Sequence, residues 1–228
     1  MAAGDPLPTS FPPMGAEFVK PYMEFEFEGE LHRVDALVGG HNGRVASACQ
    51  ARPPVFDAER QRWVVPIENN LIDIDLGSQP EVAKAIPDHR SELRSLKVVN
   101  NPRRSFRSTG FLLTDAKTEG ERPRFPVDCI FNMHIRARVP GKPSLITVRP
   151  FQLVALGLEQ WPPPVGTVYR HDDVVELFPE WVPFSERFMS PIVRILAGDE
   201  TILTRVFQAP PEVHDSRGLF QRLVERFT

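Results

Sequence analysis

The chain has 228 residues, of which 41% are hydrophobic and 25% charged, and its formal net charge is −3. These values are typical of a globular protein with a buried core, and they argue against a strongly basic, nucleic-acid-binding protein. The 24 prolines outnumber the 14 glycines. Because proline removes a backbone donor and stops helices, this excess predicts many short elements joined by ordered loops.

The N-terminal segment predicts an extended, proline-rich arm over residues 1–16, followed by a single β-rich domain over residues 17–228. The segment lacks the basic and apolar regions of a secretory signal, and no stretch approaches 18 apolar residues, so no membrane span is expected. Only Cys49 and Cys129 are present, too few for a disulfide framework or a structural zinc site. These features predict a cytoplasmic protein with reduced thiols.

Alternating apolar and polar residues in the first half of the chain predict half-buried strands. Residues 22–28 alternate, and Glu28-Gly29 can turn the chain into a second strand that contains Val34 and Val38. Residues 62–77 predict two further strands, with Asn69-Asn70 as a possible turn between them.

The clearest alternation runs from Val127 to Val139. The odd positions are all apolar, and the even positions are mostly polar. This pattern predicts a long strand whose odd residues are buried and whose even residues are mostly exposed. The apolar run over residues 145–161 follows a turn at PGKPS, and it predicts an antiparallel return strand. Residues 191–208 predict another hairpin, with Gly198-Asp199 at its tip.

Two helices are expected. Ser78 and Glu81 match a capping-box pattern that predicts a short helix near residues 79–86. Ser216 can cap a C-terminal helix with an apolar stripe. Residues 88–100 are ambiguous between helix and strand. Since strands do not alternate with helices, the sequence predicts a mainly β protein, either an antiparallel β-sandwich or an open barrel.

No phosphate-binding loop, dinucleotide fingerprint, nucleophile elbow or zincin motif occurs in the sequence. No cofactor and no metal are therefore expected. His171 and Asp173 could share one face of a strand and hold a metal, although a polar turn at this position is the favoured interpretation. The basic clusters at residues 103–107 and 122–124 are interpreted as solvated loops, and no nucleic-acid partner is expected.

The even face of the 127–139 strand provides the only candidate catalytic residues. Asn132, His134 and Arg136 would place an amide, a titratable base and a fixed cation in one row. His134 could then act as acid or base, with Arg136 as the anchor for an anionic group. The favoured alternative is that these residues form the polar face of a half-buried sheet.

A second candidate site lies in the aromatic segment FPEWVPFSERFM, which two prolines interrupt. Aromatic and methionine side chains can line an apolar pocket, and they can equally fill a core. The candidate ligand-binding residues are Phe178, Trp181, Phe184, Phe188 and Met189.

Two functional hypotheses follow from the sequence. The first is an intracellular protein that binds an apolar small molecule or a protein partner without turnover. The alternative is a lyase, isomerase or cyclase that needs no nucleotide cofactor and uses His134 and Arg136. A concave His134 face would favour the enzyme, and a solvent-flat face would favour the binding protein.

Overall fold

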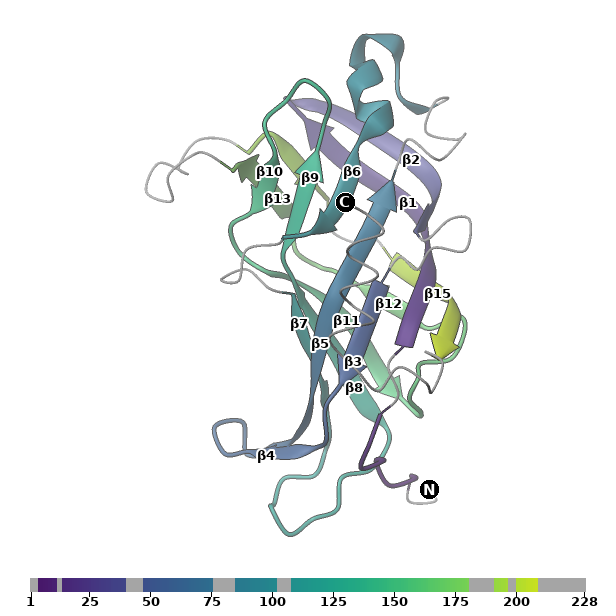
Figure 1. Cartoon of the computed structure of the whole chain (residues 1–228), viewed down its shortest axis with the longest axis vertical. Coiled ribbons are helices and arrows are strands. Elements are labelled where there is room, and N and C mark those ends of the chain that lie inside the picture. The colour runs from purple at the N-terminus through teal and green to yellow at the C-terminus, as the bar shows by residue number, and fades with distance from the viewer. Residues whose placement is uncertain are drawn as a thin grey trace.

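The computed structural model describes residues 4–11, 14–39, 47–75, 85–101, 108–180, 191–196 and 200–208. The regular secondary structure of this part of the chain is almost all β-strand (Figure 1). A short 3₁₀ helix, η3 (Asp88–Ser95), precedes β6 and resolves the ambiguity over residues 88–100. The strands are β1 (Met14–Phe27), β2 (Glu30–Gly39), β3 (Ser47–Ala51), β4 (Val55–Asp57), β5 (Arg62–Asp75), β6 (Lys97–Asn100), β7 (Thr109–Leu113), β8 (Val127–Met133), β9 (Ile135–Arg138), β10 (Leu145–Thr147), β11 (Phe151–Leu158), β12 (Val168–Arg170), β13 (Val175–Pro179), β14 (Val193–Ile195) and β15 (Glu200–Gln208).

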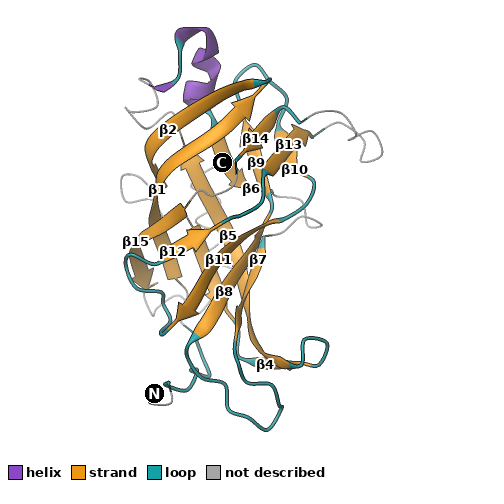
Figure 2. Ribbon diagram, turned by 180° about the vertical axis from the view of Figure 1, so that it is seen from behind, coloured by secondary structure: helices purple, strands orange, loops and turns teal. Residues whose placement is uncertain are grey.

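The strands form two curled antiparallel sheets, each a half-barrel, which confirms the predicted sandwich or open barrel (Figure 2). Strand pairing continues without a break from one half-barrel to the other, in the order β14-β13-β10-β9-β6-β5-β3-β1-β15-β12-β11-β8-β7, with β2 on β1 and β4 on β5. Further pairings join β14 to β1 and β7 to β5. The strands β6, β9, β10, β13 and β14 lie toward one end of the molecule, and β7, β8, β11, β12 and β15 lie toward the other.

The predicted strand 127–139 keeps the same face toward the core along its whole length, but its neighbouring strands change at His134. Before that residue, β8 pairs with β7 and β11; after it, β9 pairs with β6 and β10. All seven odd positions are buried, with no more than 8% of any residue exposed, so the predicted apolar face is confirmed. The expected exposure of the even positions was largely wrong, because all except Arg138 are half-buried. Gln152 and Glu180 bond to side chains on this face and reduce its exposure.

The strand pairing predicted for a hairpin over residues 191–208 is wrong, and its expected tip, Gly198-Asp199, lies outside the described residues. β2 pairs with one edge of β1 over Phe18–Phe27, so β14 and β15, which pair with residues in the same stretch of β1, must lie on its other edge. Both run antiparallel to β1, and therefore parallel to each other. They extend one after the other along β1, so each pairs with this long strand and not with the other.

Two other predicted turns have different outcomes. The turn at Glu28-Gly29 is confirmed, and both residues have positive φ, 49° and 85°, as a two-residue hairpin loop requires. The turn at Asn69-Asn70 is wrong, because β5 continues through both residues. β3 pairs alongside this part of β5, and its register shifts by one residue next to Asn69. The pairing therefore absorbs the irregularity without ending the strand.

Both cysteines lie in the buried core as free thiols. The Tyr169 hydroxyl lies 3.6 Å from the Cys129 sulfur, and the Tyr169 ring packs 5.7 Å from that of Phe131. Burial raises the pKa of Cys129 to about 12 and also raises that of Cys49. Both therefore behave as small buried hydrophobes rather than as reactive thiolates.

Charged residues join the β1–β2 turn to η3 and to the turn after β9. Arg90 binds Glu28 and Glu30 at 2.9 Å each, and Lys142 binds Glu28 at 2.6 Å. The two cations also lie 5.2 and 5.5 Å from the centre of the buried Phe27 ring. Bonding to Lys142 is the largest of the effects that lower the pKa of Glu28. We call this group the ionic clamp.

The arm and the expected helices are described in part. Residues 4–11 dock against the 123–126 loop, with Leu7 and Phe11 buried, and residues 14–16 belong to β1. Of the predicted helix near 79–86, residues 79–84 lie outside the described residues, and Ala85 is helical. The predicted C-terminal helix also lies outside the described residues.

We expect Phe131→Ala to lower the free energy of unfolding by about 3–5 kcal/mol, because it removes a buried ring and leaves a cavity. His134→Ala should cost markedly less, since the hydrogen bonds of its backbone remain. Chemical denaturation of the two variants and the wild type measures both values. The reverse order would contradict the assigned facing of this strand.

Candidate functional site

His134 lies where β8 ends and β9 begins, and its backbone is held from neighbouring segments. Its N–H donates to the Ser108 hydroxyl at 3.0 Å. Its carbonyl accepts from the Asn101 N–H at 3.0 Å and from the Ser108 hydroxyl at 3.2 Å. The next N–H, of Ile135, donates to the Thr147 hydroxyl at 3.1 Å. His134 thus has a structural role at the point where the strand changes partners.

The even-face row is present, but its members bind protein groups. The Asn132 side-chain oxygen accepts from the Gln152 amide at 3.0 Å. Arg136 forms a largely buried ion pair with Glu180, just after β13. Burial lowers the pKa of His134, which keeps the imidazole neutral near pH 7. Because the guanidinium of Arg136 is already paired with the Glu180 carboxylate, the row resembles a polar sheet face more than an anion-binding site.

Strand register places Phe178, the described member of the aromatic candidate site, two strands away from Arg136. Ile146 of β10 pairs with Arg136 on one side and with Phe178 on the other. Two strand spacings, about 10 Å, therefore separate Arg136 from Phe178. Phe178 is buried in β13, so it is a packed residue of the sheet. The other candidate ligand-binding residues, Trp181, Phe184, Phe188 and Met189, lie outside the described residues.

His171 is buried beside the Phe151 ring, and its Nδ1 lies 3.1 Å from the carbonyl oxygen of Asp173. The side chains of Asp172 and Asp173 are exposed. Within the described ranges, no group of three or more His, Cys, Asp or Glu side chains is arranged to hold a metal ion. His171 therefore fits the polar-turn interpretation.

An apolar row crosses the outer face of the sheet formed by β5, β7, β8 and β11. Strand register places Pro66, Phe111, Ile130 and Val154 side by side on this face. A pocket of about 320 Å³ opens at one end of the row. It is lined by Val55, Asp57, Arg60, Val64, Pro66, Gly110 and Phe111.

The guanidinium of Arg60 lies 5.3 Å from the centre of the Phe111 ring and is paired with Asp57. Val55 is 47% exposed and Leu156, two residues beyond Val154, is 73% exposed. We call the set Val55, Pro66, Phe111, Ile130, Val154 and Leu156 the outer-face patch.

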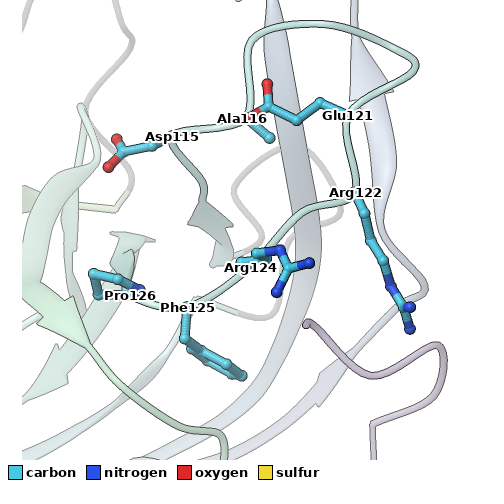
Figure 3. A pocket seen from close by; sticks show the side chains of 7 residues that line it. All are labelled: Asp115, Ala116, Glu121, Arg122, Arg124, Phe125 and Pro126. Carbon is cyan, nitrogen blue, oxygen red and sulfur yellow. The ribbon is translucent and has the colours of Figure 1, made fainter. Parts of the chain in front are cut away.

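A second pocket, of about 330 Å³, lies in the loop between β7 and β8 (Figure 3). Its lining combines two acidic with two basic residues beside the Phe125 ring. The residues are Asp115, Ala116, Glu121, Arg122, Arg124, Phe125 and Pro126. The charges balance, and the Arg124 guanidinium donates to the Gly4 carbonyl at 3.2 Å. This supports the interpretation of residues 122–124 as a solvated loop. Arg103, Arg104 and Arg107 lie outside the described residues.

The sequence analysis did not predict the outer-face patch, because the even positions of the 127–139 strand are mostly polar. Ile130 is the one apolar residue among the even positions of that strand, and it marks the row. The alternation of Phe111 and Leu113 against Leu112 is a second signal, since it gives β7 apolar residues on both faces. Strand register, which the sequence does not supply, is needed to align these residues.

Comparisons with family models, curated proteins and solved structures each find no significant match to this chain. No helix among the described residues is long and apolar enough to cross a membrane.

We predict that His134→Gln flattens the fall in stability as the pH drops below about 7.5. An unfolded histidine titrates near pH 6.5, while burial lowers the pKa of His134 in the folded state. Between these two pKa values the unfolded chain binds a proton that the folded chain does not, so stability falls as the pH drops.

Urea unfolding at several pH values measures this slope. His32, whose pKa burial also lowers, acts in the same direction, so His32→Gln/His134→Gln should be flatter still. Identical pH profiles for wild type and His134→Gln would contradict the assigned cause.

Proposed function

We propose that this protein is a binding module that engages a protein partner through the outer-face patch. The observation that carries the proposal is the apolar row Pro66–Phe111–Ile130–Val154, which crosses four adjacent strands on a face pointing away from the core. A sheet face turned toward solvent normally carries polar residues. The four row residues are half-buried, and the flanking Val55 and Leu156 are exposed. Contiguous apolar surface of this kind is a recognised mark of interaction sites.

A protein partner fits this surface better than a small molecule does. Small-molecule sites surround most of the ligand, whereas this pocket lies on the outer face of a sheet. Its volume of about 320 Å³ suits one large apolar side chain. Interface hot spots use this arrangement, in which an anchor fills a pocket within a broader contact area. The Asp57–Arg60 pair at the pocket supplies a polar rim.

The enzyme hypothesis has less support. Its anion anchor, Arg136, is paired with Glu180, and the Asn132 side chain is bonded to Gln152. Binding at the outer-face patch needs no catalytic group. The buried free thiols of Cys49 and Cys129 are consistent with the proposed cytoplasmic location, where thiols stay reduced.

We expect Val55→Asp to weaken partner binding at least tenfold, because it places a charge at the edge of the apolar pocket. Val174→Asp is the matched control: Val174 is also 47% exposed, and it lies outside the patch. The measurement is quantitative affinity purification from the source cells with the wild-type protein and each variant as bait.

A partner retained by wild type and Val174→Asp but lost with Val55→Asp supports the proposal. If all three baits retain the same proteins equally, the outer-face patch is not the interface. Thermal melting of each bait confirms that the comparison is made between folded proteins.

A further inference from the structure

The N-terminal arm docks in the manner of a bound peptide. The Leu7 N–H donates to the Pro123 carbonyl at 2.9 Å, and the Phe125 N–H donates to the Asp5 carbonyl at 2.9 Å. These two bonds form an antiparallel bridge between Pro6 and Arg124. Main-chain pairing of this kind is how extended peptides add to an existing structure in β-augmentation.

Close packing at one end of the arm leaves room only for glycine at position 4. A Cβ atom built on Gly4 would lie 1.9 Å from the carbonyl oxygen of Phe125. The clashing atom belongs to the backbone, which cannot move aside as a flexible side chain would. Any larger residue must therefore displace this part of the arm.

Two apolar side chains anchor the rest of the arm. Leu7 and Phe11 are both buried, and the Phe11 ring meets the Trp161 ring edge-on at a centroid distance of 6.4 Å. The Gln50 amide donates to the Phe11 carbonyl at 2.9 Å. Backbone pairing supplies affinity in such a complex, and the buried anchors supply specificity.

We propose that Gln50, the segment Pro123–Phe125 and Trp161 form a peptide-binding site, which we call the arm site. Its partner is an extended peptide with Gly, then Leu three residues later and Phe four residues after that, as in Gly4, Leu7 and Phe11. The arm occupies this site in cis. Its contacts are with residues distant in sequence, so the same bonds are available to a separate chain.

The tether determines how readily another peptide can bind. A covalently attached segment competes at an effective concentration of roughly millimolar. The wild-type chain is therefore largely closed to a second peptide, and loosening the arm should open the arm site. None of the arm-site residues belongs to the outer-face patch, so this inference is independent of the proposed function.

The test uses full-length Gly4→Val protein, in which the arm is displaced and the arm site is unchanged. A fluorescent synthetic peptide of residues 1–13 is titrated against it, and binding is followed by anisotropy. We expect saturable binding to this variant and at least tenfold weaker binding to the wild-type chain. A peptide that itself carries Gly4→Val should bind the variant at least tenfold more weakly than the wild-type peptide does.

No saturable binding up to roughly millimolar peptide, or equal binding of the two peptides, would overturn the proposal. If Gly4→Val protein lacks a cooperative thermal transition, full-length Phe11→Ala replaces it, because that change loosens the arm at its other anchor. Adding Val55→Asp to the receptor chain should leave peptide binding unchanged, which separates this result from the test of the outer-face patch.

Discussion

The hydroxyl of Ser108 and the backbone of His134 form the contact that holds the long strand where its pairing passes from β7 and β11 to β6 and β10. The run from Val127 to Val139 keeps its apolar face inward throughout, yet its neighbours change at His134. At such a point the backbone loses its regular ladder partners, and an unpaired half-buried peptide group is costly. Ser108 serves both the N–H and the carbonyl of His134, and Asn101 supplies a second donor to that carbonyl.

The same contact explains why His134 is a poor candidate for catalysis. The residue sits on the even face at the change of partners, where burial favours the neutral imidazole. Its neighbour Arg136 is held by Glu180, which links β9 to the end of β13. The polar row therefore stabilises the junction between strands. The apolar part of this face lies elsewhere, around the half-buried Phe111 and Ile130.

The two ends of the molecule are closed by different interactions. At one end, the ionic clamp joins the β1–β2 turn to η3 and covers Phe27 with two cations. Exposed ion pairs contribute little to stability individually, so the clamp mainly fixes positions. At the other end, the arm inserts Leu7 and Phe11 into the protein surface. Each end therefore uses a segment distant in sequence to cover residues that the sheet alone would expose.

The facing of each strand could be predicted from the sequence, because apolar and polar residues alternate between its buried and exposed faces. The apolar face of Val127–Val139 and the turn at Glu28-Gly29 were predicted for this reason. Register could not be predicted, because it depends on which distant strand lies alongside. The turn expected at Asn69-Asn70 and the hairpin pairing expected over residues 191–208 were wrong for that reason: β3 extends beside β5, and β14 and β15 each pair with β1. The outer-face patch could not be predicted for the same reason, because strand register alone aligns its residues on neighbouring strands.

The most direct test of this account is the free energy of unfolding of Ser108→Ala, with Ser95→Ala, an exposed serine in η3, as the control. Removing the Ser108 hydroxyl leaves the His134 N–H without this partner. We predict a loss of about 1–3 kcal/mol for Ser108→Ala, while the control stays within about 0.5 kcal/mol of wild type. Equal stability of the two variants would contradict the claim that this contact stabilises the strand at the point where it changes partners.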